Sequence, residues 1–299
     1  MERIPRILGT YEGEQNGPLL VVTAGVHGNE PSGVKALQDI FRELEEKQPP
    51  MKGTFLGIAG NLEALQQDKR FIDEDLNRTW TRDKLEKSVP QTHEEKEMKE
   101  IIEVLEKYPE SEYPSRYFID CHTTSSASLP YISVQDVGSN NDFAHLFPTY
   151  IVVGFSDIVD GSIDKYFSSK GITGFTFEAG QHTDQNTRKN QETLIWLALH
   201  EVCEVELENI SCYPTCHDVF PQQYPEGQQT FEILYRHGLK EGDTFEMRPG
   251  FQNFEQIQKD QLLAMHNGQE IRSKWDATLF MPLYQAQGND GFFIIGHQS

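Results

Sequence analysis

A histidine and a carboxylate separated by two residues lie on a glycine-containing turn near the start of the chain. The turn, Gly25–Glu30, directly follows the apolar run Leu19–Ala24 and holds His27 and Glu30. An imidazole and a carboxylate at this spacing can bind one zinc ion, and the glycines leave room for it. With ten histidines in the chain, roughly one such pair is expected by chance. Other residues must therefore decide whether this pair binds a metal ion.

A third ligand candidate is His122, which follows the strand-like run Tyr117–Cys121. Ligands of an open α/β sheet collect at the carboxyl ends of its strands, so we expect His122 to lie near His27 and Glu30. Three protein ligands with a fourth position left open are typical of a catalytic zinc. The sequence therefore predicts one zinc ion per chain, held by His27, Glu30 and His122.

Glu178 occupies an equivalent position after another strand-like run, Thr173–Phe177. It is not needed as a ligand, so it can act as a general base that takes a proton from the attacking water and returns it to the leaving amine. Asp120 is placed to orient His122 through the second ring nitrogen. The alternative is that these are unrelated polar residues at loop mouths, with the histidines bonded to backbone groups.

The segment Arg70–Arg78 lies between these motifs and is rich in charge. Asn77 and Arg78 are suited to hold a substrate carboxylate, because a guanidinium donates two parallel hydrogen bonds. Arg70 can stabilise an oxyanion formed on a carbonyl. The alternative is a surface loop in which the two arginines pair with the acidic residues 73–75.

The elements that position these residues alternate between short β-branched runs and helical patterns, which is typical of an α/β fold with a mostly parallel sheet. We predict strands at 4–11, 19–24, 53–59, 117–121, 150–153 and 173–177. We predict helices at 31–46, 92–108 and 190–207, the second beginning with a Thr-x-x-Glu capping box.

The pattern changes after about residue 209, where short alternating strands replace the helices. We predict strands at 231–236, 244–247, 262–266, 270–273, 278–281 and 292–296, with a hairpin turn at Asn267 and Gly268. The predicted division is a catalytic α/β domain over 1–208 and a smaller β domain over 209–299.

Composition narrows the class of protein. The 299 residues carry a formal charge of -21, which disfavours nucleic acid and anionic membranes as partners. No apolar run is long enough to span a bilayer and the first residues lack a secretory signal, so a cytoplasmic location is expected. The four cysteines predict free thiols, although Cys212, Cys216 and His217 leave a second metal cluster open. Oligomeric state is also left open.

Taken together, the motifs resemble the succinylglutamate desuccinylase and aspartoacylase family of zinc deacylases, relatives of the zinc carboxypeptidases. The similar segments are Gly25–Glu30, Gly60–Asn61, Asp73–Arg78, Asp120–Thr123 and Phe177–Gly180, in the family's order. The resemblance implies a carboxypeptidase-like fold, a mostly parallel mixed sheet with helices on both faces, followed by a β domain that covers the active site.

The resemblance also implies a reaction, the hydrolysis of a small anionic N-acyl amino acid. His27, Glu30 and His122 would hold zinc, Glu178 and Arg70 would act on the scissile amide, and Asn77 and Arg78 would hold a carboxylate. A zinc carboxypeptidase and a non-catalytic binding relative are the alternatives.

The chain departs from aspartoacylases in one respect, because no arginine lies in the segment 164–170 upstream of Glu178. Lys165 or Lys170 is a candidate replacement, but lysine lacks the guanidinium fork, so acetylaspartate is a doubtful substrate. Tyr284 is the nearest candidate for a substrate-contacting tyrosine, with packing in the β domain as the alternative.

Overall fold

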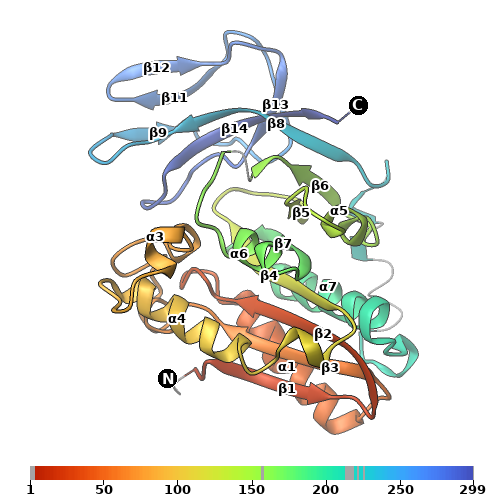
Figure 1. The fold of residues 1–299 in the computed structure, drawn as a ribbon. Coiled ribbons are helices and arrows are strands. Elements are labelled where there is room, and N and C mark those ends of the chain that lie inside the picture. The colour runs from red at the N-terminus through yellow and green to blue at the C-terminus, as the bar shows by residue number, and fades with distance from the viewer. Residues whose placement is uncertain (1–3, 156–157, 213–218, 221, 225, 299) are drawn as a thin grey trace.

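A large mixed sheet organises the chain. The computed structural model describes all residues except 1–3, 156–157, 213–218, 221, 225 and 299. The sheet has eleven strands in the order β1-β3-β2-β4-β7-β5-β6-β8-β14-β13-β10, and a separate three-stranded sheet has the order β12-β11-β9. Figure 1 shows the large sheet running from the N-terminal strands to the C-terminal ones.

The elements have the following bounds. The strands are β1 (Ile7–Glu12), β2 (Gln15–Ala24), β3 (Lys52–Ala59), β4 (Arg116–Thr124), β5 (Tyr131–Val134), β6 (Tyr150–Val153), β7 (Thr173–Gln181), β8 (Thr230–Gly238), β9 (Phe245–Met247), β10 (Glu255–Ile257), β11 (Leu262–His266), β12 (Gln269–Arg272), β13 (Ala277–Phe280) and β14 (Asp290–His297). The helices are α1 (Ser32–Lys47), α2 (Leu62–Gln67), α3 (Arg82–Leu85), α4 (His93–Leu105), α5 (Asn140–Ala144), α6 (Ile163–Ser169) and α7 (Thr187–Cys203), with short 3-10 turns at Leu76–Arg78, Glu110–Glu112 and Leu207–Asn209.

Four parallel strands, β3, β2, β4 and β7, form the centre of the sheet. The edge strand β1 is antiparallel to β3, and β5 is antiparallel to β7. The central strands are almost continuously buried, as expected where both faces are covered. The predicted α/β fold with a mostly parallel mixed sheet is confirmed.

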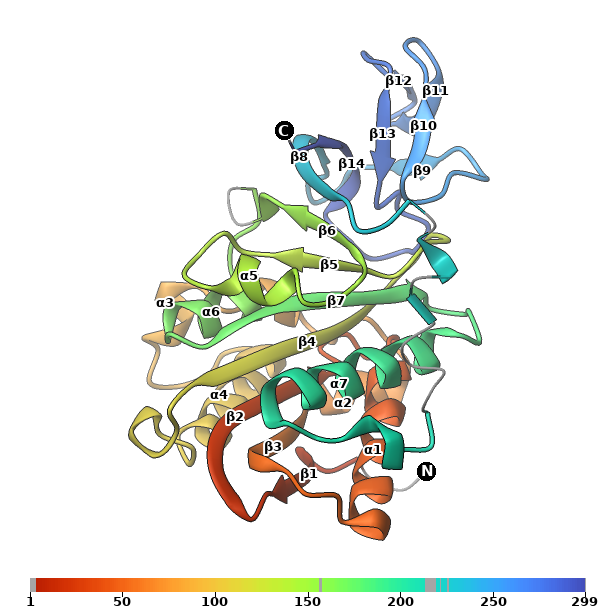
Figure 2. The ribbon, with the colours of Figure 1, turned by 90° about the vertical axis from the view of Figure 1, so that its right-hand side faces the viewer.

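Helices cover both faces of this sheet. On one face α1 packs against α7, and their apolar side chains form a core with the inward residues of β2, β4 and β7. On the other face α4 and α6 supply Met98, Ile101 and Phe167 to a second core. Figure 2 shows α1 and α7 in front of the sheet and α4 behind it. The sheet is therefore held rigidly from both sides.

The predicted N-terminal signal of α4 is present in part. The Thr92 side chain accepts a hydrogen bond from the Glu95 amide at 3.2 Å, as in a capping box. The Glu95 carboxylate, however, accepts from the Gln91 amide at 2.6 Å. The helix ends at Leu105, three residues before the predicted end at Tyr108.

The C-terminal strands extend the large sheet. Strand β8 pairs in parallel with β6, and β14, β13 and β10 follow it in antiparallel order. A small core that includes Met247, Leu263 and Phe292 lies between these strands and the three-stranded sheet. Each strand predicted after residue 230 has a counterpart, whereas β10 and the earlier β5 were not predicted. The domain boundary at 208/209 stays a prediction.

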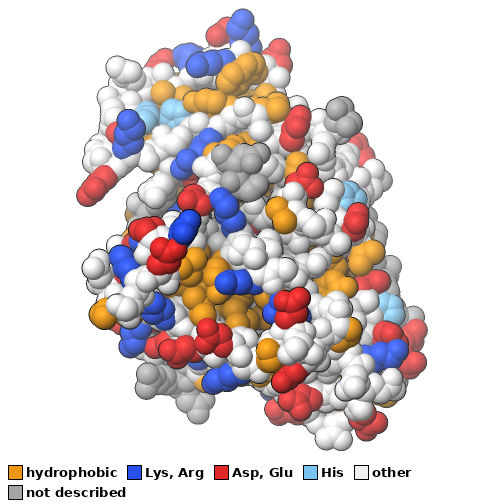
Figure 3. Space-filling model, viewed as in Figure 1, with side chains coloured by type: hydrophobic (Ala, Val, Ile, Leu, Met, Phe, Trp, Pro, Cys, Tyr) orange, Lys and Arg blue, Asp and Glu red, His pale blue; other side chains and the backbone are white. Residues whose placement is uncertain are grey.

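One face of the molecule is polar and mixed in charge. On the face shown in Figure 3, acidic and basic side chains are interspersed around a group of hydrophobic side chains near the middle. In the part of the chain that the structure describes, no helix has the combination of length and apolar character needed to cross a membrane.

Candidate active site

The site lies at the carboxyl ends of the parallel strands β4 and β7, next to β5, which is antiparallel to β7. His122 on β4 lies opposite Glu178 on β7, and Glu178 lies opposite Tyr131 on β5. Because residues paired across a sheet point to the same face, these three side chains form a row across three strands. The ladder of backbone hydrogen bonds sets their spacing.

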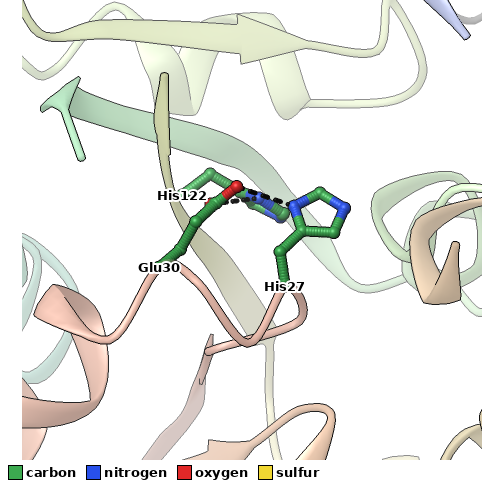
Figure 4. Close-up of side chains that lie close together, drawn as sticks. All are labelled: His27, Glu30 and His122. Carbon is green, nitrogen blue, oxygen red and sulfur yellow. Dashed lines mark hydrogen bonds and ion pairs between the residues drawn. The ribbon is translucent and has the colours of Figure 1, made fainter. Parts of the chain in front are cut away.

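His27, Glu30 and His122 converge in the way the sequence predicts. His27 Nδ1 lies 2.9 Å from Glu30 Oε1, and His122 Nδ1 lies 3.1 Å from Glu30 Oε2. All three side chains are buried, and one potential ligand atom of each lies within 4.8 Å of the others. Figure 4 shows them meeting from the turn before α1 and from β4. This donor set of two imidazole nitrogens and a carboxylate oxygen suits zinc.

Each histidine of this cluster also contacts a carboxylate through its other ring nitrogen. His122 Nε2 lies 2.6 Å from Asp120 Oδ2, and Asp120 Oδ1 accepts from the hydroxyl of Thr23 at 2.5 Å. His27 Nε2 lies 3.0 Å from Asp75 Oδ1. Carboxylates in this position fix the orientation of a ligand histidine and make it more basic. The contact predicted for Asp120 is present, and Asp75 makes the equivalent contact to His27.

The charges of this cluster shift its pKa values strongly. Burial would raise the pKa of Glu30, but His27 and His122 outweigh it and lower that pKa well below its ordinary value. Burial would lower the pKa of His122, yet Asp120 and Glu30 raise it well above the usual range. The pKa of Asp75 is likewise lowered well below its ordinary value against the effect of burial, chiefly by His27 and Arg70. The carboxylates are therefore kept ionised, as metal binding requires.

Glu178 has the opposite environment. Burial raises its pKa to about 8; the charge of Glu30 adds to this effect, and His122 and Arg70 oppose it. Its Oε2 atom is buried and has no hydrogen-bond partner within the described structure. A buried carboxyl oxygen without a hydrogen-bond partner costs free energy and calls for an explanation. A pKa raised to near neutrality is what a proton-transferring carboxylate needs.

A loop over 70–78 carries the arginines and is held by Glu94 in the first turn of α4. The carboxylate of Glu94 accepts from the amides of Ile72, Asp73 and Glu74 at 2.8 to 3.2 Å. It also accepts from the side chain of Asn61 at 2.8 Å. A buried carboxylate with four donors fixes this loop against the sheet, so the loop is not the exposed segment of the alternative interpretation.

Arg70 lies beside the metal-ligand cluster and lines the same pocket as Glu178. Its Nη2 donates to Asp75 Oδ2 at 3.0 Å, and its Nη1 lies 3.5 Å from Glu30 Oε1. The Nε atom is buried without a partner among the described residues. The guanidinium therefore brings positive charge beside the metal-ligand cluster.

Asn77 and Arg78 lie on the 3-10 turn that follows. The Asn77 side-chain oxygen accepts from the Ile163 amide at 2.9 Å. Arg78 Nη2 donates to Asp290 Oδ2 at 3.1 Å, and Asp290 Oδ1 accepts from Arg236 Nε at 2.5 Å. Arg78 is thus tied to the C-terminal strand β14.

One pocket contains all seven predicted site residues. Its lining includes His27, Glu30, Arg70, Asn77, Arg78, His122 and Glu178. The C-terminal part contributes Met281, Leu283, Gln285, Gly288, Asn289 and Asp290. Residues from distant parts of the sequence therefore converge on one concave site, which is the usual form of a small-molecule site.

The structure does not support the three secondary candidates. Lys165 Nζ pairs with Asp160 at 2.9 Å, and Lys170 Nζ lies over the ring of Tyr166; neither lysine lines the pocket, so neither replaces the missing arginine. The Tyr284 hydroxyl donates to Arg248 O at 2.6 Å and accepts from the Phe251 amide at 3.0 Å, and Tyr284 is not among the pocket-lining residues. Tyr284, which is 38% exposed, is therefore bonded to the backbone of the β region.

The suggested second metal cluster, Cys212, Cys216 and His217, includes two residues that the structure does not describe. Cys216 and His217 lie outside the described residues. Cys121 and Cys203 are unpaired and buried, as the sequence predicts.

Sequence reasoning missed several pocket residues. Tyr131, Gln135 and Asp164 are almost completely buried and line the pocket. Asp164 lies in the segment 164–170, which was considered only as the source of a cation to replace the missing arginine. The other two lie on or just after the unpredicted strand β5. The alternation of Tyr131, Ser133 and Gln135 was the available signal, since it places polar groups on one face of a strand.

Comparison with known proteins identifies the sequence family. Residues 16–197 match the model of the succinylglutamate desuccinylase/aspartoacylase catalytic domain. Succinylglutamate desuccinylase of Pseudoalteromonas atlantica is 26% identical over 276 residues, which cover 86% of this chain and 74% of that protein. The enzyme of the same name from Photorhabdus laumondii is 31% identical over 119 residues, which cover 38% of this chain and only 36% of that protein.

The fold has close counterparts among solved structures. A succinylglutamate desuccinylase/aspartoacylase from Rhodobacter sphaeroides superposes with a TM-score of 0.70 at 16% identity, covering 97% of this chain and 88% of the other. At this identity the likeness shows the fold.

Proposed function

Because the chain belongs to the succinylglutamate desuccinylase/aspartoacylase family, we propose that it is a zinc-dependent amidohydrolase that removes a short acyl group from an amino acid. The acyl group is of the acetyl or succinyl type. The observation that carries this proposal is the unpartnered carboxyl oxygen of Glu178 in the same pocket as the cluster of His27, Glu30 and His122.

The residues present fit one zinc ion. Two imidazole nitrogens and a carboxylate oxygen lie within 4.8 Å of one another, and the histidines are oriented by Asp120 and Asp75. When bound, zinc would act as a Lewis acid on the scissile carbonyl and make water a stronger acid.

Glu178 and Arg70 act on the reacting groups in this proposal. Glu178 takes a proton from the attacking water and then gives it to the nitrogen of the breaking amide bond, which needs a carboxyl group with a pKa near neutrality. Arg70 donates hydrogen bonds to the oxygen that gains negative charge during the attack.

Asn77 and Arg78 hold the α-carboxylate of the amino acid. The Asn77 carbonyl oxygen is occupied by the Ile163 amide, so the amide nitrogen of that side chain is the group left to bind a carboxylate. Arg78 supplies positive charge beside it, and its contact with Asp290 keeps it in place. The substrate is therefore a small anion.

The C-terminal residues at the pocket favour a small substrate over a peptide. One side of the site is closed by Leu283, Gln285 and Asp290. A carboxypeptidase would need this side to be open, because it must admit a peptide chain. We therefore prefer a deacylase to a carboxypeptidase, with residues 209–299 forming the cover. A non-catalytic relative is disfavoured because a binding site alone gives no reason for the buried, unpartnered oxygen of Glu178.

A substrate screen with the zinc-loaded protein tests the proposal. We expect amine release from N-acetyl or N-succinyl amino acids and none from blocked dipeptides. Loss of this activity on removal of zinc with a chelator, and its return on adding one equivalent, would support zinc dependence. Hydrolysis of peptides but not of N-acyl amino acids would establish the carboxypeptidase alternative instead.

A further inference from the structure

The part of the pocket beyond Glu178 along β5 is lined by buried polar side chains. We call this part the distal wall; it consists of Ser133, Gln135, Ser162 and Asp164, all buried and all lining the pocket. Ser133 lies opposite Thr176, two residues before Glu178 on β7. Ser133 is thus one step further along the sheet than Glu178.

Asp164 fixes which atom of Gln135 is left to contact a ligand. Asp164 Oδ2 lies 2.7 Å from Gln135 Nε2, and Asp164 Oδ1 accepts from the Lys165 amide at 2.8 Å. Because a carboxylate only accepts hydrogen bonds, the amide nitrogen of Gln135 must face it. The other amide atom, Gln135 Oε1, is buried and has no partner within the described structure.

The fixed polar groups of the distal wall are therefore acceptors. The serine hydroxyls can donate or accept, but Asp164 and Gln135 Oε1 present oxygen lone pairs. Among the described lining residues the cationic side chains are Arg70 and Arg78 together with the site histidines, none of which belongs to the distal wall. Lys165, the cation nearest in sequence, pairs with Asp160 at the surface.

A carboxylate placed against this wall would meet another carboxyl group and an amide oxygen, and both contacts are repulsive. A group bearing N–H donors would instead satisfy Gln135 Oε1 and share Asp164. Sites built from buried hydrogen-bonding groups reject ligands that leave those groups unpaired.

We propose that the distal wall selects N-acyl amino acids whose side chain ends in a hydrogen-bond donor, an amide or ammonium group, and rejects those whose side chain ends in a carboxylate. This inference rests on the proposed function and names the substrate class within it. Asp164 is the residue that sets the preference, both directly and by orienting Gln135.

Two isosteric ligand pairs provide the test, N-acetylglutamine against N-acetylglutamate and N-acetylasparagine against N-acetylaspartate. Each pair differs only in whether the side chain ends in an amide or a carboxylate. Binding is measured by calorimetry to zinc-loaded E178Q, in which turnover is expected to be blocked. We expect the better amide ligand to bind at least about tenfold more tightly than its acid partner.

The variant D164N, combined with E178Q, tests the assigned residue. An asparagine can turn either its oxygen or its nitrogen toward the ligand, so we expect the preference between the paired ligands to narrow to within about threefold. A purely structural role for Asp164 would weaken both ligands of a pair equally and leave their ratio unchanged. Thermal unfolding of D164N confirms that the variant is folded.

The outcomes separate this inference from the proposed function. Equal binding within each pair, tighter binding of the acids, binding of none of the four ligands, or an unchanged ratio in D164N would overturn the inference. The proposed function is judged separately from hydrolysis by the wild-type enzyme across the N-acyl amino acid screen. If the wild type hydrolyses N-acetylaspartate and N-acetylglutamate best, the deacylase stands and the role of the distal wall falls.

Discussion

His122 and Glu178 lie directly opposite each other on the adjacent parallel strands β4 and β7. One joins the cluster that suits zinc, and the other carries the unpartnered carboxyl oxygen. The sheet, braced by helices on both faces, fixes their separation, so a proton acceptor is held beside the place where the substrate carbonyl would be activated.

Replacing Glu178 by Gln should remove the proton acceptor and leave the metal ligands in place. We expect kcat to fall by on the order of 10²–10⁴-fold, with zinc content, measured by plasma mass spectrometry, unchanged. The conservative variant E178D should retain part of the activity. Full activity in E178Q would exclude the assigned role, and loss of zinc would indicate that Glu178 is a ligand.

Replacing Asp120 by Asn should weaken zinc binding, because the second nitrogen of His122 would lose its carboxylate partner at 2.6 Å. We expect the zinc affinity to fall by roughly 10–100-fold, measured by competition with a chromophoric chelator. D136N, at an exposed position, is the matched control. Equal affinities in the two variants would argue that Asp120 does not orient a ligand.

Replacing Arg78 by Lys should impair substrate binding more than chemistry, since lysine keeps the charge but loses the fork. Loss of one charge-assisted hydrogen bond corresponds to roughly a tenfold or greater increase in KM, with zinc content unaffected. R82K is the control, because Arg82 is exposed and pairs only with Glu86 among the contacts of the described structure. A drop in kcat at constant KM would contradict the assigned role.

Replacing Glu94 by Gln should destabilise the loop over 70–78. A glutamine offers one oxygen where Glu94 uses two, so its NH₂ group would face backbone amides that also donate. We expect the free energy of unfolding to fall by about 2–4 kcal/mol, measured by urea titration. E103Q, on the exposed side of α4, should change it by less than about 0.5 kcal/mol; equal effects would show that the contacts of Glu94 do not support the loop.

Asp164 should make the free energy of unfolding depend on pH. Burial raises its pKa in the folded protein above the ordinary value, even though Gln135 and Ser162 oppose the shift. Its contribution to stability is therefore fully present below the unfolded pKa and is lost as the pH rises through the folded pKa. Wild type should therefore lose stability relative to D164N as the pH rises above about 4, the ordinary pKa of an aspartate. Groups with lowered pKa values, such as Asp75, act in the opposite direction but equally in both proteins. Urea titrations at several pH values measure the difference, and a difference independent of pH would contradict the prediction.

The central strands and long helices could be predicted from sequence because burial on both faces and helical periodicity leave clear patterns. Strand β5, which has only four residues, was not predicted. Because β5 was missed, its pocket residues Tyr131 and Ser133 and the adjacent Gln135 were missed as well.

The metal-ligand candidates could be predicted because they follow predicted strands, and the carboxyl ends of such strands meet at one edge of the sheet. The carboxylates that support them were harder to recognise. Asp75 and Glu94 read as ordinary surface charges in an acidic chain. Only the folded structure shows that Glu94 is buried and that the Asp75 side chain is 9% exposed, each among donors. Similarly, Asp164 carries no sequence pattern that distinguishes it from a solvent-exposed helix residue.

Strand β8 joins β6 by the same parallel hydrogen bonding that links the strands of the α/β region. The C-terminal residues that cover the pocket therefore belong to a region that cannot move away as a rigid unit without breaking these backbone hydrogen bonds. We expect substrate entry and product release to depend on side chains and on the segment 281–289, which lies between β13 and β14 and lines the pocket. Turnover limited by product release would consequently respond to substitutions in this segment and not to changes in the flexibility of an interdomain hinge.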